Sequence, residues 1–243
     1  MTYIQNKDGL IGDFLGSVPA MQELGRRDKL VVQIHPEALK LVPLIYNPDG
    51  IVFTEIATGQ VSHTIYSATA FQIATAKNLY MSQAFFEQVG LEIPLVAPKA
   101  DLRLIEAHTP TYDYIISPFA RSLPSSQKLP KSEWKQLVDS MPNKKFCVIG
   151  TTVHDDPEFI VGPNVETRFD MDFNYVGSLL RNATKGLISV VTGTSHLAFH
   201  LGVKNWILNN QDFAWGTNPD GVSIRDHIPA LFGEKIREYL ENS

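Results

Sequence analysis

A turn of small hydroxyl residues lies between an apolar stretch and a predicted helix in the second half of the chain. Residues 190–202 read VVTGTSHLAFHLG, so Thr192, Gly193, Thr194 and Ser195 stand where a strand would end and a helix would begin. The first backbone N–H groups of a helix have no partner within the helix, and the helix dipole adds partial positive charge there. This turn therefore predicts a site for the phosphates of a ligand.

Two histidines follow on the same predicted helix. His196 and His200 are four residues apart and so share one helical face, as the histidines of some zinc sites do. The glutamate of an H-E-x-x-H pattern is absent and the neighbours are apolar, which favours packed or hydrogen-bonding histidines over a metal site. We therefore expect His196 in the cleft and no bound metal. The turn also matches half of the G-x-S-x-G pattern of serine hydrolases, but the closing glycine is missing.

Gly12 and Asp13 stand at the turn into the first predicted helix. A carboxylate at the carboxyl end of a strand points into the crevice of an open α/β sheet, where it can act as a general base. Aspartate is also a preferred helix N-cap and is stabilised by the positive end of the helix dipole. The sequence leaves both roles open for Asp13.

Cations lie in a Ser/Pro-rich loop after another predicted strand. Residues 117–134 read SPFARSLPSSQKLPKSEW and contain Ser117, Arg121 and Lys128. Such cations could bind an anionic ligand such as a diphosphate. A solvated loop with ordinary surface cations is the alternative, and the segment by itself favours it.

Two acidic clusters complete the set of candidates. Asp155 and Glu158 follow the apolar stretch KFCVIG, where they could bind a ribose hydroxyl or belong to an ordinary polar loop. Asp170 and Asp172 have the D-x-D spacing with which metal-dependent glycosyltransferases of another fold hold a divalent cation. No apolar strand is evident before them, so we predict a loop leading into a helix that begins at Val176.

Alternating strand and helix patterns must position these groups. In the first half, a helix is predicted after the first glycines, strands at 29–34 and 51–56, a short helix at 36–44, and one long helix at 68–90 that ends at Gly90. In the second half, strands are predicted at 114–117, 145–150, 187–191 and 206–208, and helices at 132–141, 176–183, 195–201 and 228–240. This alternation predicts α/β architecture with parallel sheets and crossover helices. The two runs meet near residues 94–112, so we expect domains of 1–110 and 111–243 with a ligand cleft between them.

The composition excludes several classes of protein. The 243 residues are 44% hydrophobic and 19% charged, which is ample for a globular core. A formal net charge of −5 argues against a nucleic-acid binder, which needs a basic surface. No apolar run reaches the roughly 20 residues of a membrane span and the start has no signal-peptide pattern, so we expect a cytoplasmic protein. The single cysteine, Cys147, lies in an apolar stretch and is predicted to be buried and inert.

Three of these segments, taken in order, resemble the bacterial ADP-heptose:lipopolysaccharide heptosyltransferases of glycosyltransferase family 9. The early Gly-Asp and Pro-Ala-Leu of that family are similar to Gly12-Asp13 and residues 19–21, PAM. Its Lys-x-Trp-Pro segment is similar to residues 128–134, KLPKSEW, although the first tryptophan is missing. Its Asp-Ser/Thr-Gly-x-x-His-Leu-Ala is similar to residues 191–198, VTGTSHLA.

The resemblance implies a GT-B-like fold of two Rossmann-like domains facing a cleft, and an inverting transfer that uses neither metal nor cofactor. It makes Asp13 the base that deprotonates the acceptor hydroxyl. Lys128 would neutralise the diphosphate leaving group with help from Ser117 and Arg121, so that fixed donors replace a metal ion.

The resemblance also implies the binding partners. Thr192, Gly193 and Thr194 would donate to the phosphates of a nucleotide-diphosphate sugar, with an ADP-sugar favoured, and Asp155 or Glu158 would hold its ribose. The acceptor would be a glycan or another hydroxyl compound. The protein would work in the cytoplasm, or peripherally at the inner face of the membrane.

The chain departs from the family in ways that leave alternatives open. Val191 stands where the family has an acid, and the N-terminal, acceptor-side half is reduced. The donor class is therefore better supported than the acceptor. A degenerate protein that binds a nucleotide sugar without transferring it, and a sugar-nucleotide epimerase of the same shape, are the alternative interpretations.

Overall fold

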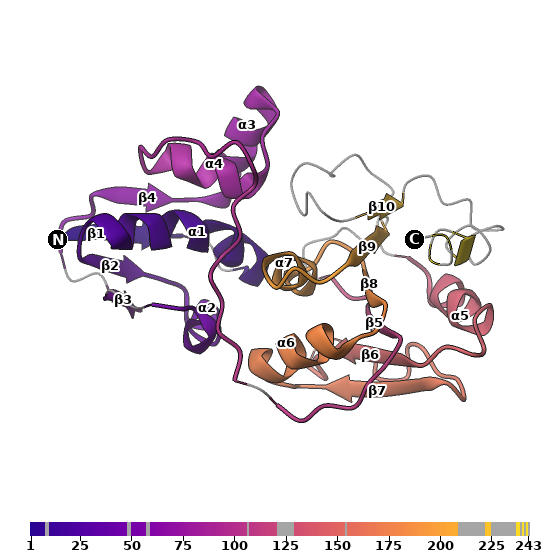
Figure 1. Cartoon of the computed structure of the whole chain (residues 1–243). Coiled ribbons are helices and arrows are strands. Elements are labelled where there is room, and N and C mark those ends of the chain that lie inside the picture. Colours follow the sequence, from indigo (N-terminus) through magenta and orange to yellow (C-terminus); the bar gives the residue numbers. More distant parts are fainter. Residues whose placement is uncertain are drawn as a thin grey trace. The chain divides into compact units, whose positions relative to one another are not determined.

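Figure 1 shows the computed structural model of the chain. It describes residues 1–7, 10–47, 50–56, 59–105, 107–120, 129–153, 155–208, 222–224, 237–238, 240 and 242. The chain divides into two compact units, of which the first consists mainly of Met1–Ile105 and the second of most of the remaining residues, while Phe199–Leu201 group with the first. Each unit contains one parallel sheet. Within the described residues, no helix combines the length and the apolar character needed to cross a membrane.

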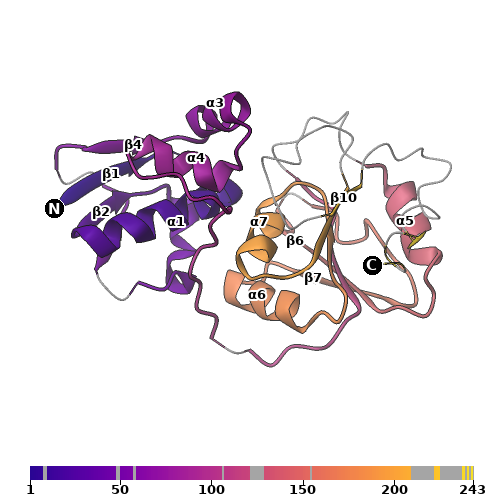
Figure 2. The same ribbon diagram turned by 45° about the horizontal axis from the view of Figure 1, so that its top comes forward.

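The first unit is built on a four-stranded parallel sheet with the strand order β3-β2-β1-β4. The strands are β1 (Thr2–Asn6), β2 (Leu30–Gln33), β3 (Ile51–Thr54) and β4 (His63–Ile65). The helices are α1 (Ile11–Arg27), α2 (Pro36–Leu39), the 3-10 turn η1 (Val42–Leu44), α3 (Ser67–Lys77) and α4 (Met81–Gln88). Helices α1 and α4 pack against each other (Figure 2), and a Cβ added at Gly16 would lie 3.3 Å from the Phe85 ring. This packing fixes α1, and with it the position of Asp13.

The second unit is built on a six-stranded parallel sheet with the strand order β10-β9-β8-β5-β6-β7. The strands are β5 (Tyr114–Ser117), β6 (Phe146–Gly150), β7 (Val165–Phe169), β8 (Gly186–Ser189), β9 (Asn205–Leu208) and β10 (Val222–Ile224). The helices are α5 (Lys131–Asp139), α6 (Phe173–Asn182) and α7 (Gly193–His200). Counted within its own unit, this sheet has the 3-2-1-4-5-6 order of nucleotide-binding doubly wound folds, and the first sheet has its 3-2-1-4 part. The order reverses between β1 and β4 and again between β5 and β8.

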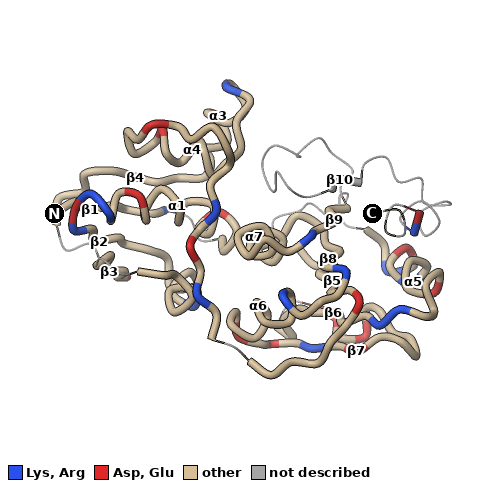
Figure 3. The backbone as a smooth tube through the Cα atoms, in the orientation of Figure 1, with Lys and Arg blue, Asp and Glu red and all other residues tan. Residues whose placement is uncertain are grey.

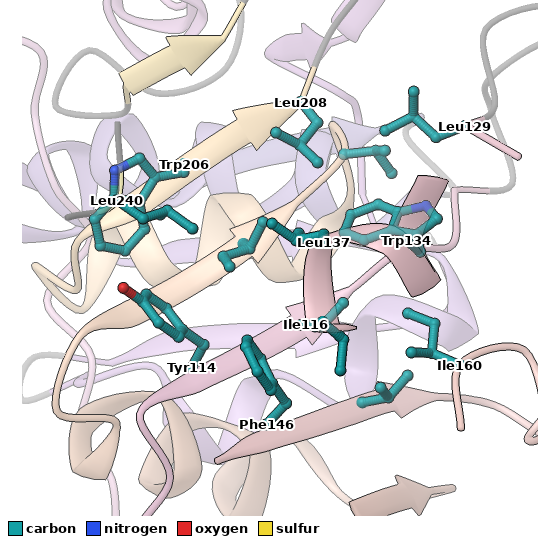
Figure 4. Close-up of a cluster of buried hydrophobic side chains, with 14 of the residues drawn as sticks. Tyr114, Ile116, Leu129, Trp134, Leu137, Phe146, Ile160, Trp206, Leu208 and Leu240 are labelled. Carbon is teal, nitrogen blue, oxygen red and sulfur yellow. The ribbon is translucent and has the colours of Figure 1, made fainter. Parts of the chain in front are cut away.

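An aromatic core packs on the second sheet (Figure 4). Tyr114 on β5 stacks on Phe146 of β6 with ring centroids 5.6 Å apart and meets Trp206 of β9 edge to face at 5.7 Å. Trp134 of α5 is fully buried in the same cluster. Cys147 on β6 is buried, and burial raises the pKa of its thiol to about 12, as expected of an inert cysteine.

The predicted long helix at 68–90 is wrong, because the structure has two helices there. Helix α3 ends at Asn78, whose φ of 53° is left-handed, a conformation that asparagine adopts more readily than most residues. Helix α4 restarts after Tyr80, whose N–H donates to the Gln83 side chain at 3.0 Å. Gly90 has a φ of +72°, as its predicted place at a helix end requires. The predicted helix at 36–44 is likewise divided, into α2 and η1.

Short or half-exposed strands escaped prediction. Strand β4 has three residues, and β7 (VETRF) lies at the sheet edge and has no apolar run. A strand, β7, does end at Phe169, but it is not an apolar one, and Asp170 and Asp172 lie in the predicted loop before a helix. The predicted helix at 228–240 lies almost wholly outside the described residues.

Candidate functional site

The carboxyl ends of β5 and β8 form the candidate site of the second unit. These neighbouring strands lie where the strand order reverses, and Ser117 is the register partner of Ser189. The N–H of Val190 donates to the Ser117 carbonyl at 3.3 Å, so the chain leaving β8 passes directly beside Ser117. Open α/β sheets bind ligands outside the carboxyl ends of their strands at such a reversal. The structure thus places Ser117 beside the chain that leads into the turn before α7.

Reciprocal hydrogen bonds shape the turn before α7. The Thr192 hydroxyl accepts from the N–H groups of Thr194 at 3.0 Å and Ser195 at 3.4 Å. In return, the Ser195 hydroxyl accepts from the Thr192 N–H at 3.1 Å and donates to the Thr192 carbonyl at 2.7 Å. Thr192 is therefore the cap of α7. Ser195 is fully buried, so its hydroxyl maintains the turn and is not presented to a ligand.

Two donors of this turn remain for a ligand. Within the described part of the chain, no hydrogen bond is made by the Gly193 N–H or the Thr194 hydroxyl. Gly193 is the first residue of α7, and the N–H at that position has no acceptor within its own helix. Its missing side chain also allows close approach of an anion to the backbone. These two groups are the best-placed phosphate donors of the turn.

The two histidines of α7 have different surroundings. His196 is partly buried in the first turns of the helix, and desolvation lowers the pKa of its imidazole to about 4. His200 is buried, and its Nδ1 accepts a backbone N–H at 2.9 Å. No group of three or more metal-ligating side chains occurs among the residues that the structure describes. The hydrogen-bonding histidine predicted for this helix is therefore present at His200.

His196 gives the protein a predicted pH dependence. An unfolded histidine titrates near 6.5, so between about pH 4 and 6.5 the unfolded state binds more protons than the folded state. Stability is then fully present above pH 6.5 and falls as the pH drops through this window. We expect the free energy of unfolding to fall by about 1–2 kcal/mol between pH 7 and pH 5 because of this one group. Urea titrations of the wild type and of His196→Gln check this: equal pH dependence in both proteins would contradict it.

Asp13 lies at the corresponding edge of the first sheet. Helix α1 begins at Ile11 with Leu10 as its N-cap, so the prediction that Asp13 is the N-cap residue is wrong. Asp13 is instead the third helical residue, partly exposed, in the turn where the helix dipole favours a carboxylate. Gly12 beside it is buried. Because β1 pairs with β4 at the reversal of strand order, Asp13 stands where a ligand of this unit would bind.

The acidic residues after β6 have partners within a polar loop, which is one of the two alternatives that the sequence leaves open. Oδ2 of Asp155 accepts hydrogen bonds from the Thr151 N–H at 2.8 Å and from the Thr151 hydroxyl at 3.3 Å. Both bonds lie within the same loop. Glu158 is exposed, and its N–H donates to Asp156 at 2.9 Å. The structure therefore gives Asp155 a local role in the loop, and a ribose contact of either residue stays a prediction.

The D-x-D pair also has structural partners. Asp170 accepts the N–H of Thr152 at 3.0 Å and the hydroxyl of the same residue. Asp172 is the N-cap of α6 and accepts the N–H of Tyr175 at 2.7 Å. The carboxylates of Asp170 and Asp172 thus each accept a hydrogen bond from a backbone N–H of the described chain. Arg121 and Lys128, predicted to face the diphosphate, lie outside the described residues.

Sequence reasoning missed an aromatic cluster beside this site. Phe119 follows β5, Phe169 ends β7, and Phe159 lies in the loop between β6 and β7; all three are partly buried. The Phe119 ring centroid is 5.1 Å from that of Phe159 and 6.0 Å from that of Phe169. The residues are up to 50 positions apart in the sequence, so only the strand order brings them together. A partly exposed aromatic surface of this kind can pack against a flat ring.

Gly150, at the end of β6, is enclosed by this cluster. A Cβ there would lie 2.7 Å from the Phe169 ring and 3.0 Å from both the Phe119 ring and Oδ2 of Asp155. We expect Gly150→Ala to lower the free energy of unfolding by about 1–3 kcal/mol through overpacking. Gly162→Ala is the matched control, because its Cβ would have no neighbour nearer than 3.4 Å. Urea denaturation measures both, and equal stability of the two variants would contradict the predicted close packing.

Comparison with known proteins identifies the fold. No family model matches the chain. No curated protein matches it either. Among solved structures, the E. coli heptosyltransferase WaaC with ADP has a TM-score of 0.69 at 14% identity, with 100% of this chain and 99% of WaaC covered. The chain has the heptosyltransferase fold.

Two further structures with the heptosyltransferase fold are similar to the chain. The iron-containing dodecameric glycosyltransferase TibC from enterotoxigenic E. coli H10407 has a TM-score of 0.70 at 13% identity, with 93% of this chain and 63% of TibC covered. The chain thus spans less than two thirds of TibC. The glycosyl transferase family 9 protein from Veillonella parvula DSM 2008 has a TM-score of 0.66 at 13% identity, with 98% of this chain and 89% of that chain covered. At these identities the likeness concerns the fold.

The heptosyltransferase fold confirms the predicted α/β class with two Rossmann-like parallel sheets. Among the described residues the two sheets are unequal, with four strands in the first and six in the second. Residues 55–62 connect β3 to β4, and their described part contains no helix, whereas a parallel crossover usually carries one. Lys and Arg are interspersed with Asp and Glu over the described elements (Figure 3), in keeping with the net charge of −5. The unit that contains Asp13 therefore has the smaller sheet.

Proposed function

We propose that the protein is an inverting glycosyltransferase that moves a sugar from a nucleotide-diphosphate sugar to an acceptor hydroxyl without a metal ion. One observation carries the proposal: in a heptosyltransferase fold, the reversal point of the larger sheet combines Ser117 with the donors of the turn before α7. WaaC was solved with ADP, and TibC with ADP-D-beta-D-heptose. An ADP-sugar is therefore the first donor to test.

The distribution of donors and carboxylates supports one orientation of the nucleotide. The turn before α7 offers the Gly193 N–H and the Thr194 hydroxyl to an anion. After β6, by contrast, the N–H and hydroxyl groups of Thr151 and Thr152 are already bonded to aspartates. Phosphate would be repelled there, so we place the diphosphate at α7 and the nucleoside over the aromatic cluster.

The proposed step is a single displacement. Asp13 accepts the proton of the acceptor hydroxyl, and the acceptor oxygen forms a bond to the anomeric carbon. The bond from that carbon to the diphosphate oxygen breaks on the opposite side, so the configuration inverts and the electron pair leaves with the diphosphate. The donors at α7, together with Arg121 and Lys128, stabilise the departing charge.

A ligand screen tests this function. We expect ADP-sugars to raise the thermal midpoint more than UDP-, GDP- or CDP-sugars, equally with and without EDTA, because a ligand that binds only the folded state stabilises it. The comparison with and without EDTA tests for a metal requirement, since TibC, which has a similar fold, is iron-containing. Stabilisation by no nucleotide sugar would overturn the proposed function, and strict dependence on a divalent metal would overturn its metal-independent form.

A binding protein without transferase activity is the second candidate. Val191, at the turn before α7, supplies no carboxylate where the resembled family has an acid. Such a protein would bind the same donor but neither transfer nor hydrolyse its sugar. An epimerase of the same fold would convert the donor in the absence of any acceptor. Product analysis of the donor alone, and then with hydroxyl acceptors, separates the three functions.

A further inference from the structure

Beyond the last ladder pair of β6 and β7, one residue holds the two strand ends together. The ladder ends at the pair Gly150 and Phe169, and the next N–H, that of Asp170, donates to the Gly150 carbonyl at 3.1 Å. Asp170 has a φ of 55°, which turns the chain so that its carboxylate returns to the β6 side. There it accepts the N–H of Thr152 at 3.0 Å and the Thr152 hydroxyl. Asp170 therefore makes three hydrogen bonds across the gap between the two loops.

These three hydrogen bonds of Asp170 with Gly150 and Thr152, which we call the clamp, lie directly beside the aromatic cluster. Phe169, the residue before Asp170, has its ring centroid 6.0 Å from that of Phe119. The carbonyl of Gly150 accepts the hydrogen bond from the Asp170 N–H. A side chain at Gly150 would not fit between those two rings. A shift of the β7 end relative to β6 would therefore move Phe169 against its neighbours. The hydrogen bonds of Asp170 fix the spacing of the surface that these rings form.

The clamp also fixes the electrostatic character of this edge. Asp155 and Asp170 together occupy every N–H and hydroxyl donor of Thr151 and Thr152. A loop whose donors are filled by carboxylates offers nothing to a phosphate. What it can present to a ligand is the aromatic surface beside it.

We infer that Asp170 is a positioning residue for the nucleoside half of the donor, acting through Phe169 and the loop after β6. The inference rests on the proposed function, because it assumes a nucleotide ligand at this edge. It assigns Asp170 no contact with the reacting atoms and no metal. Loss of the clamp is expected to weaken binding of the nucleoside and to leave binding of the diphosphate unchanged.

The decisive variant is Asp170→Gly. Glycine adopts a φ of 55° without strain, so this change removes the carboxylate and leaves the backbone conformation accessible. By calorimetry, we expect the Kd of ADP to rise about 10-fold, a change within the range that a residue outside the ligand contacts can cause, with the Kd of pyrophosphate within about twofold of the wild type. In turnover assays, the donor KM should rise while kcat at saturating donor is retained.

Three further variants separate the clamp from other causes. Asp170→Asn keeps a carbonyl acceptor and tolerates the left-handed backbone, so it should restore most of the ADP affinity. Thr152→Val removes only the hydroxyl partner and should give a smaller loss in the same direction. Asp172→Ser removes a nearby negative charge but keeps a helix cap, so it should bind ADP like the wild type.

Several outcomes would overturn the inference. Wild-type affinity for ADP in Asp170→Gly would do so, as would a parallel loss of ADP and pyrophosphate binding, which indicates general disruption. If Asp170→Gly fails to fold, unchanged ADP affinity in Thr152→Val has the same meaning. A wild-type protein that binds neither ADP nor the other nucleoside diphosphates would instead remove the proposed function, and this inference with it.

Discussion

Replacing Asp13 with asparagine is expected to lower kcat by about 10²- to 10⁴-fold while the Kd of ADP stays within about twofold of the wild type. The amide is isosteric but cannot take a proton from the acceptor hydroxyl. Asp13 is partly exposed in the first turn of α1, at the strand-order reversal of the first sheet, which is where a base would face a ligand. ADP binding should not change, because the proposed donor site belongs to the second unit.

Glu23 on the same helix provides the matched control. Its carboxylate pairs with Arg27 at 2.8 Å and Arg26 at 3.1 Å near the end of α1. Glu23→Gln should retain kcat and lower the free energy of unfolding by no more than about 1 kcal/mol, as expected of exposed ion pairs. The comparison uses kcat with saturating donor and acceptor, once an acceptor is known, or slow hydrolysis of the donor before then. Undiminished turnover in Asp13→Asn would remove Asp13 as the base.

Replacing Gly193 with proline is expected to weaken ADP binding by about 10- to 100-fold and to leave the fold intact. Proline at the first position of a helix removes only an N–H that has no acceptor in the helix, and its fixed φ suits that position. The preceding residue, Thr192, is the helix cap. A cap residue usually has an extended backbone, and an extended backbone is also what proline favours in the residue before it. A charge-assisted hydrogen bond from this N–H to a phosphate contributes about 1.5–3 kcal/mol, which corresponds to the predicted loss.

Gly193→Ala is the control for this substitution. Alanine adds a side chain but keeps the N–H, so binding should fall much less than with proline. Calorimetry with ADP and pyrophosphate should show the proline variant losing both ligands, in contrast to the loss of ADP alone expected for Asp170→Gly. Thermal midpoints equal to the wild type would exclude unfolding as the cause. If Gly193→Pro bound pyrophosphate normally, the diphosphate would have to lie elsewhere.

Local patterns in the sequence predicted the elements whose burial is regular. The strands β2, β3, β5, β6, β8 and β9 overlap the predicted strands, because each is a short apolar run with turn residues at its ends. Helix α1 and the turn before α7 were equally visible, since helical spacing and a small-residue turn are local features. The failures were also local in origin: β7 at the sheet edge shows no apolar run, and Asn78 breaks a helix that its neighbours would continue.

The sequence by itself therefore determined the α/β class and the stretch, residues 192–194, where a phosphate site is expected. Only the tertiary structure decided how individual side chains are used. It buried Ser195 in the turn and bonded Asp155 and Asp170 to neighbouring loops. It also assembled Phe119, Phe159 and Phe169 around Gly150. The physical reason is that periodicity encodes which residues are buried, whereas the partner of each group depends on strand order, and strand order brings together residues far apart in the chain.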